Sequence, residues 1–356
     1  MEFLLLVFIT SFFVVLLSTP ALIKVAILKR LFDEPGERKL HKRMIPTIGG
    51  IIIFAGTLLS FSLWFPTEKL ILDMDVSRAS MNDFKFIVVT VLILFFVGVK
   101  DDIIGTAPIK KLAAHILVSL ILVLMADVRI TGLHGIFGVT DIPFWASVFL
   151  SLFSIIVIVN AFNLIDGVDG LASGIGFIVS ASFAFWFFYA GDVVMALLAT
   201  ALAGALLGFL IFNFSPAKIF MGDSGSLTIG VIVAVLAIRL VEFEKTDLGK
   251  SPLTHFSRPV FAMACLVYPL VDTLRIFIYR AVKGISPFAA DRNHLHHRLI
   301  DIGLNHKKTV LILYIVNIAI IALSVVLQDY DPNYALVIVG GSALIVAQIP
   351  FFIRKM

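Results

Sequence analysis

Cysteine and charged residues are both scarce in this sequence of 356 residues. Its one cysteine, Cys265, cannot form an internal disulfide, and a metal site built from several thiolates is excluded. Only 15% of the residues are charged, whereas about a quarter are charged in an average soluble domain. The sequence therefore argues against a disulfide-stapled domain and against a soluble fold.

Apolar residues take the place of the missing charges. They make up 60% of the chain, and the mean hydropathy is +1.06. A spanning helix needs roughly 20 mostly apolar residues, and eleven stretches approach that length. They are 3–28, 46–65, 84–99, 112–126, 144–162, 171–190, 193–212, 226–242, 259–279, 309–328 and 334–353. We predict an all-α, polytopic membrane bundle of about 11 transmembrane helices that forms one domain over residues 1–356.

The basic residues between these stretches predict the orientation. With the N-terminus outside, the inner segments hold 18 Lys and Arg and the outer segments hold 7. Cytoplasmic loops carry the excess of these residues, so we expect the N-terminus outside and the C-terminus inside. The net charge of +4 then reflects topology, and no nucleic-acid partner is expected. The outer segment 129–139 alternates β-branched residues with glycines, which predicts a small β-hairpin.

Four of the inner segments are rich in acids, amides, glycines or histidines. They are residues 100–105, 160–170, 213–226 and 291–298. All four fall on the same side of a topology that was derived from Lys and Arg alone. We therefore expect them to form one polar site at the cytoplasmic face.

The first of these segments contains two adjacent acids. Asp101 and Asp102 follow an apolar stretch directly. Like charges this close raise the pKa of one group unless a cation lies near. The pair is a solvated helix end that faces water, or it has a function as a metal-associated pair or as a general base.

The second segment combines oxygen ligands with glycine. Asp166 and Asp169 are three residues apart, as are Asn160 and Asn163, so a helix would present each pair on one face. Gly167 would let the backbone approach a ligand closely. Carboxylate and amide oxygens suit Mg²⁺, which combines a few carboxylates with substrate phosphate oxygens.

The third segment reaches an apolar helix through Gly222-Asp223-Ser224-Gly225-Ser226. Glycines and hydroxyls at a helix N-terminus can bind an anion, and Asp223 would add a metal ligand. A plain N-cap by Asp223 or Ser224 is the alternative.

The fourth segment is basic and contains three histidines. His294, His296, His297 and Arg298 would clamp a diphosphate, because arginine makes bidentate contacts with phosphate oxygens. A zinc site and a surface for lipid headgroups are the alternatives.

Two other sets of charges bear on the site. Arg38 and His41, in the first inner segment, would hold a lipid phosphate, or the basic residues there only anchor the neighbouring helix. Asp272 and Arg275 lie within the ninth apolar stretch, where charges are costly and usually paired. We expect a structural pair there.

In this order, the four segments resemble the polyprenyl-phosphate N-acetylhexosamine-1-phosphate transferase family over essentially the whole chain. The run His294-Leu295-His296-His297-Arg298 is most similar to the bacterial branch that makes undecaprenyl-linked N-acetylglucosamine. The related MurNAc-pentapeptide transferases carry a longer histidine run. The resemblance implies an enzyme of the bacterial inner membrane that requires Mg²⁺, with Mn²⁺ as a substitute.

The resemblance also implies the reaction. Undecaprenyl phosphate would attack the β-phosphate of UDP-GlcNAc at the cytoplasmic face, giving undecaprenyl-diphosphate-GlcNAc and UMP. This would be the first membrane step of a cell-envelope glycan such as lipopolysaccharide O-antigen or teichoic acid. Another UDP-N-acetylhexosamine, including the MurNAc-pentapeptide nucleotide, stays open, and so does a homodimer.

The nucleotide and metal sites follow from the same resemblance. Asp223 and Asn163 would ligate the Mg²⁺ that bridges the diphosphate. Gly167, Asp169 and Phe220 would form the uridine pocket, with Phe220 stacking on uracil.

The remaining roles concern the phosphates and the lipid. Lys111 would contact phosphate, and the histidine segment (His294, His296, His297 and Arg298) would close over the sugar and diphosphate. Asp101 and Asp102 would activate the lipid phosphate, as base or as covalent nucleophile. Asp166 is the third candidate catalytic acid.

Two other protein classes share some of these features. Transporters place charges near the midplane and often contain internal repeats, whereas the polar clusters here lie at one face and no repeat is detected. A CDP-alcohol phosphotransferase would share the Asp-Gly pairs at 166–170 but needs further aspartates downstream, and residues 171–190 contain none.

Overall fold

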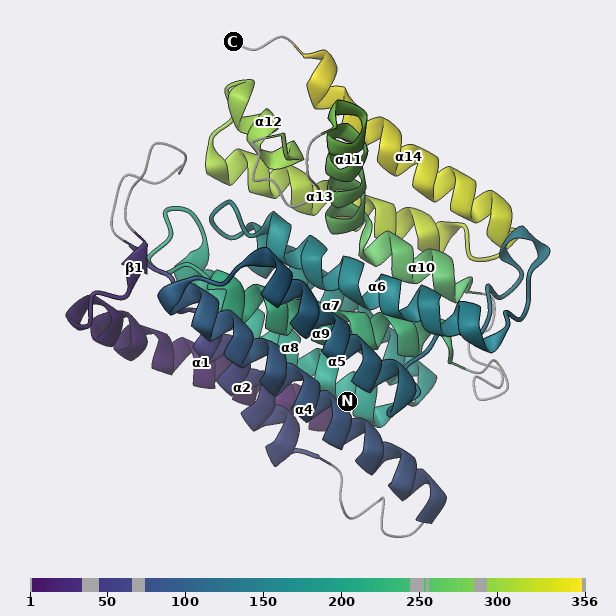
Figure 1. The fold of residues 1–356 in the computed structure, drawn as a ribbon, viewed down its shortest axis with the longest axis horizontal. Coiled ribbons are helices and arrows are strands. Elements are labelled where there is room, and N and C mark those ends of the chain that lie inside the picture. Colours follow the sequence, from purple (N-terminus) through teal and green to yellow (C-terminus); the bar gives the residue numbers. More distant parts are fainter. Residues whose placement is uncertain are drawn as a thin grey trace.

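The computed structural model describes residues 2–33, 45–65, 74–243, 253, 256–284 and 293–353. The fold is almost entirely helical (Figure 1). The helices are α1 (Glu2–Leu28), α2 (Gly50–Leu63), α4 (Met74–Ile104), α5 (Pro108–Leu124), η1 (Ile136–Gly138, a 3-10 turn), α6 (Phe144–Ile165), α7 (Leu171–Ala190), α8 (Val193–Asn213), α9 (Gly222–Val241), α10 (Arg258–Cys265), α11 (Val267–Lys283), α12 (Leu295–Asp301), α13 (His306–Val326) and α14 (Pro332–Phe352). Two short strands, β1 (Phe32–Asp33) and β2 (Ile45–Pro46), pair antiparallel.

Each apolar stretch predicted from the sequence coincides with helix. Within the described residues, seven helices are long and apolar enough to cross a membrane. The stretch 259–279, predicted as one span, is broken into α10 and α11, which meet at 75° and would make an eighth span together. The protein is therefore an all-α, multi-pass membrane protein, while the count of eleven spans and the orientation stay predictions.

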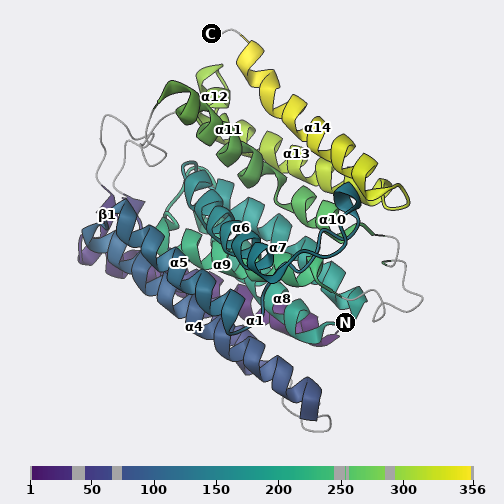
Figure 2. The ribbon, with the colours of Figure 1, turned by 45° about the vertical axis from the view of Figure 1, so that its right-hand side comes forward.

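The helices form three groups, and α9 belongs to the middle one. Helices α1, α2, α4 and α5 lie on one side of α6–α9, and α10–α14 lie on the other (Figure 2). In the most apolar 18-residue stretch of α9, 89% is buried inside the protein, compared with 22% in α1 and 28% in α14. Large apolar side chains such as Phe13 and Ile315 are exposed on the outer helices, as expected where lipid is the solvent.

Glycines allow the start of α9 to approach α2 and α4 closely. A Cβ on Gly50 would lie 2.0 Å from Gly225 N, and a Cβ on Gly98 would lie 2.5 Å from Ser224 Cα. Only glycine fits such gaps, because heavy atoms that are not bonded to each other rest about 3.5–4.0 Å apart. The end of α4 and the starts of α2 and α9 therefore meet in one corner of the bundle.

The segment between α5 and α6 turns back on itself. Leu133 N–H donates to the Thr140 carbonyl (3.0 Å), and η1 forms the tip. Only one isolated bridge joins the two arms, between Gly132 and Asp141, so this part of the chain has no regular strands. Its place on the outer face stays a prediction.

Candidate active site

Asp102 caps the first turn of α9 from the end of α4. Its carboxylate accepts hydrogen bonds from Asp223 N–H (2.7 Å), Ser224 N–H (3.1 Å) and the Ser224 hydroxyl (2.6 Å). The N-cap residue of α9 is Met221, which contributes no side-chain bond, so the alternative of a plain N-cap by Asp223 or Ser224 does not form. Burial raises the pKa of Asp102, which lies beyond the apolar stretch 84–99, to about 6 in spite of these bonds. The carboxylate of Asp102 is thus occupied by hydrogen bonds from the start of α9. Asp101 is therefore the acid of the pair that is more available to a substrate.

Lys111 bridges two carboxylates from different helices. Its Nζ lies 3.2 Å from Asp101 Oδ2 and forms a closer ion pair with Asp223. About a fifth of each of these three side chains is exposed. The ends of α4, α5 and α9 are held together by this ion pair, and one positive charge faces two negative ones.

Asp166 adds a further acid at the end of α6. Burial, followed by the charges of Asp223 and Asp102, raises the pKa of Asp166 well above its ordinary value, although Gly222 N–H donates to it. Helix α6 ends at Ile165, so the helix face expected to carry Asp166 and Asp169 together does not form. Asp169 instead lies in the turn before α7, and its Oδ2 accepts Ala217 N–H (3.1 Å).

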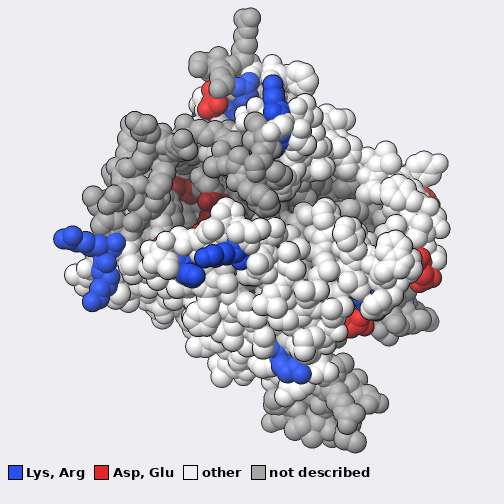
Figure 3. All heavy atoms as spheres, in the orientation of Figure 1, with Lys and Arg blue, Asp and Glu red and all other residues white. Residues whose placement is uncertain are grey.

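The charge balance of this corner fits a divalent cation. Asp101 and Asp223 pair with Lys111, and Asp166 lies close enough to Asp223 and Asp102 for their charges to raise its pKa, so four carboxylates and one lysine meet here. Oxygen donors of this kind match Mg²⁺, which takes one or two protein carboxylates together with substrate oxygens and water. On the face seen in Figure 3, some acidic side chains are visible set back from the outermost atoms.

Asn163 also lies at this corner. Its Nδ2 donates to the Ser226 hydroxyl (3.0 Å) in the first turn of α9. An amide nitrogen cannot coordinate a metal, so Oδ1 is the atom that would face an ion. The segments 100–105, 160–170 and 213–226 therefore meet in the structure.

The histidine segment faces the turn between α6 and α7. A Cβ on Gly167 would lie 3.0 Å from His296 Nε2, and the hydroxyl of Tyr268 lies 3.3 Å from His296 Nδ1. Burial lowers the pKa of His296 to about 3, so this imidazole is neutral at pH 7. His296 therefore contributes no positive charge to a phosphate clamp.

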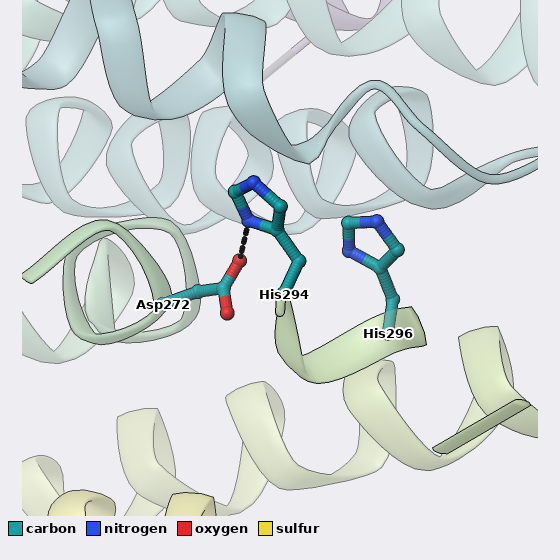
Figure 4. Close-up of side chains that lie close together, drawn as sticks. All are labelled: Asp272, His294 and His296. Carbon is teal, nitrogen blue, oxygen red and sulfur yellow. Dashed lines mark hydrogen bonds and ion pairs between the residues drawn. The ribbon is translucent and has the colours of Figure 1, made fainter. Parts of the chain in front are cut away.

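His294 lies beside His296 and is bonded to α11. Its Nδ1 is 2.7 Å from Asp272 Oδ2, as Figure 4 shows. Asp272 and Arg275 do form the expected pair, at 3.5 Å, but Asp272 has closer partners. Within the described residues, Asp272, His294 and His296 are the group that brings three metal-ligand atoms within 4.8 Å of one another.

Three other predicted residues have contacts outside the cluster of acids. Arg298 Nε donates to the Pro350 carbonyl (3.0 Å) near the end of α14. The ring of His297 lies 4.3 Å from that of His296. Phe220 enters the site through its backbone, which exchanges hydrogen bonds with Pro46 and Gly49.

Arg38 and His41 lie outside the described residues. Their predicted contact with a lipid phosphate stays a prediction.

Several neighbours of the site were not predicted from the sequence. His115 is buried four residues after Lys111, and its Nδ1 lies 3.3 Å from Asn160 Nδ2. The spacing of four places both on one face of α5, which was the available signal. The hydrogen-bond partners of Ser226 and Asp272 come from distant parts of the chain, and no local sequence pattern could have indicated them.

Comparison with known proteins gives consistent matches. Residues 84–241 match the family model "Glycosyl transferase family 4". The "Probable undecaprenyl-phosphate N-acetylglucosaminyl 1-phosphate transferase" of Bacillus subtilis (strain 168) is 32% identical over 90% of this chain and 84% of its own length. The "Undecaprenyl-phosphate alpha-N-acetylglucosaminyl 1-phosphate transferase" of Escherichia coli (strain K12) is 30% identical, over 86% and 79%. The "Decaprenyl-phosphate N-acetylglucosaminephosphotransferase" of Mycolicibacterium smegmatis (strain ATCC 700084 / mc(2)155) is 31% identical, over 90% and 82%.

Proposed function

This chain belongs to glycosyl transferase family 4, with the polyprenyl-phosphate N-acetylglucosamine-1-phosphate transferases, and we propose that it transfers N-acetylglucosamine-1-phosphate from UDP-GlcNAc to undecaprenyl phosphate. The products are undecaprenyl-diphosphate-GlcNAc and UMP. Another UDP-N-acetylhexosamine, including the MurNAc-pentapeptide nucleotide, is the alternative donor. The enzyme would work in the bacterial inner membrane with its site at the cytoplasmic face, because one substrate is a lipid and the other is water-soluble.

One observation carries this proposal. Acids from α4 and α9 pair with Lys111, Asp166 at the end of α6 lies near the acid of α9, and His296 faces Gly167 in the turn that follows α6. Phosphoryl transfer depends mainly on positioning and on charge neutralisation. A corner with excess carboxylate, a lysine and buried imidazoles supplies both once a divalent ion is bound.

The reaction needs a balanced displacement at phosphorus. An oxygen of undecaprenyl phosphate forms a bond to the β-phosphorus of UDP-GlcNAc, and the bond from that phosphorus to the bridging oxygen breaks. UMP leaves with the electron pair. A Mg²⁺ held by Asp223 and Asn163 would neutralise the charge that develops on the diphosphate.

The side chains of this chain would then divide the remaining work. Lys111 would bind a phosphate oxygen and stabilise the negative charge that develops on the leaving UMP. Asp101 would orient the lipid phosphate or take its proton, while Asp102 holds the start of α9 and so positions Asp223. Asp166 would lie behind the ion as a further acid.

The nucleotide would lie between the turn that precedes α7 and the turn that precedes α9. Gly167, Asp169 and Phe220 would contact uridine, and the histidine segment would lie over the sugar. Asp169 supports this assignment because it joins the two turns through Ala217.

Substitution of the acids tests the proposal. In purified enzyme supplied with undecaprenyl phosphate, Asp223→Asn and Asp101→Asn should each lower UMP release from UDP-GlcNAc by about 10²–10³-fold, as expected when a charge-stabilising group is lost. A panel of radiolabelled UDP-sugars, followed as labelled lipid, identifies the donor.

Asp192→Asn is the matched control. Asp192 caps the start of α8, at the end opposite Asn213, and asparagine can still accept Met195 N–H. This variant should keep wild-type turnover. Undiminished UMP release in both Asp223→Asn and Asp101→Asn would overturn the site, and sugar movement across vesicles without UMP release would point to a transporter.

A further inference from the structure

We propose that Asp272 is a positioning residue for the reaction: it fixes the tautomer of His294 so that Nε2 of this ring is offered to the substrate as a hydrogen-bond acceptor. The inference rests on the proposed function, because it assigns His294 to the sugar of the nucleotide donor. It gives α11 a part in substrate recognition that the predicted Asp272–Arg275 pair did not include.

Asp272 binds the start of α12 at two points. Its Oδ2 lies 2.7 Å from His294 Nδ1, and its Oδ1 accepts Leu295 N–H at 2.7 Å. Asp272 is 1% exposed and His294 is 5% exposed, so water does not compete for either contact. The carboxylate therefore fixes both the backbone of α12 and the ring orientation of His294.

The neighbours of Asp272 decide which atom carries the proton. Leu295 N–H donates to this carboxylate, and a guanidinium nitrogen of Arg275 lies 3.5 Å away. A carboxylate surrounded by donors has no proton to give, so His294 Nδ1 must be the donor. In the neutral ring, Nε2 then keeps its lone pair.

The ring of His294 lies beside that of His296, which faces the candidate active site. Its ring stacks on that of His296, with centroids 5.3 Å apart and an angle of 11°. Figure 4 shows both rings projecting from α12 on the same side, with the second nitrogen of His294 directed away from Asp272. Because His296 Nε2 is adjacent to Gly167, the two imidazoles line the wall that faces the proposed nucleotide pocket.

An acceptor at this position suits the sugar and not the diphosphate. Phosphate oxygens are themselves acceptors, whereas the hydroxyl and acetamido groups of N-acetylglucosamine carry donors. Neither His296, which is neutral at pH 7 because burial lowers its pKa to about 3, nor Tyr268 adds a charge to this wall. We therefore assign His294 Nε2 to a hydroxyl or amide hydrogen of the sugar.

A metal ion is the competing explanation for this cluster. Asp272, His294 and His296 have ligand atoms close enough for one. The short Asp272–His294 contact is instead occupied by a proton in our assignment, and the nearby Arg275 guanidinium opposes a cation. The metal content of the purified enzyme separates the two explanations.

Asp272→Asn tests the tautomer directly. The amide oxygen can still accept Leu295 N–H, but the amide nitrogen would donate to His294 Nδ1 and move the ring proton to Nε2. His294 Nε2 then changes from a hydrogen-bond acceptor to a donor. We expect kcat/KM for UDP-GlcNAc to fall about 10- to 100-fold. KM for undecaprenyl phosphate should not change, whereas a general loss of structure at the site would raise it.

Two substitutions of His294 provide a test that leaves Asp272 intact. His294→Gln keeps an acceptor near the place of Nε2 and should retain kcat/KM within a few-fold. His294→Asn keeps a donor for Asp272 but has no atom at that place, and it should lose as much as Asp272→Asn. In the His294→Gln background, Asp272→Asn should have little further effect.

Three results would overturn the inference. They are wild-type kcat/KM in Asp272→Asn, the reverse order of the two His294 variants, and about one zinc per wild-type chain that Asp272→Asn loses. The proposed function is judged separately by wild-type UMP release from UDP-GlcNAc. If that fails, the same ratios are measured with the UDP-sugar that the panel identifies.

Discussion

Replacing Gly98 by alanine should move the start of α9 and with it the acids of the candidate active site. The added Cβ would lie 2.5 Å from Ser224 N and Cα and 2.6 Å from the carbonyl carbon of Asp223. Relaxed contacts between heavy atoms are about 3.5–4.0 Å long, so one backbone must shift by about 1 Å. The atoms that are struck belong to the backbone of α9 and cannot rotate away as a side chain would.

The size of the effect follows from that shift. A displacement of about 1 Å in catalytic groups can cost about 10²-fold in rate, so kcat for UMP release should fall by this order. Overpacking should cost about 1–3 kcal/mol of stability, which exceeds the gain of about 0.5–1 kcal/mol from replacing a helical glycine by alanine.

Gly340→Ala is the matched control for Gly98→Ala. Gly340 lies in α14, and a Cβ there would meet no atom within 4 Å. This variant should keep wild-type turnover and equal or higher thermal stability in detergent. The reasoning fails if Gly98→Ala turns over UDP-GlcNAc at the wild-type rate with an unchanged melting temperature.

Two further outcomes concern the acids as a group. Chelation with EDTA should abolish UMP release, because the repulsion among the carboxylates around Lys111 is then uncompensated, and Mg²⁺ or Mn²⁺ should restore it; full activity in EDTA would exclude the metal. In the metal-free protein, the contribution of Asp102 to stability should be fully present below pH 4 and lost as the pH rises through about 6, because its pKa is raised from 3.8 to about 6 in the folded state. Thermal unfolding in EDTA from pH 4 to pH 7 measures this, Asp102→Asn should flatten the profile, and an unchanged slope in that variant would contradict the assignment.

Helix positions could be predicted from the sequence because apolar length is a local property. Every predicted stretch coincides with helix, including the one that contains the break at Leu266. The break itself was missed because apolar residues continue across it. The bend of 75° depends on how α10 and α11 pack against different neighbours, which no local pattern records.

Within the site, the sequence could predict which segments gather but not which atoms pair. The distribution of Lys and Arg predicted that the acidic segments share one side, and the segments 100–105, 160–170 and 213–226 do meet in the structure. The bond from Asp102 to α9 spans 121 residues and depends on the gap at Gly98. Arg298 was expected at the diphosphate, yet its guanidinium is bonded to the carbonyl of Pro350.

The cap that α4 provides to α9 has a consequence for how the chain matures in the membrane. Asp102 is synthesised and inserted well before the turn that begins at Gly222. During translation, its carboxylate is therefore present before the N–H groups of Asp223 and Ser224 that donate to it. Until α9 arrives, the chain has no Asp223 and no partner for Asp102. The described helices that precede α9 would therefore insert without the full set of acids, and the acids would be assembled only when α9 docks against Gly50 and Gly98.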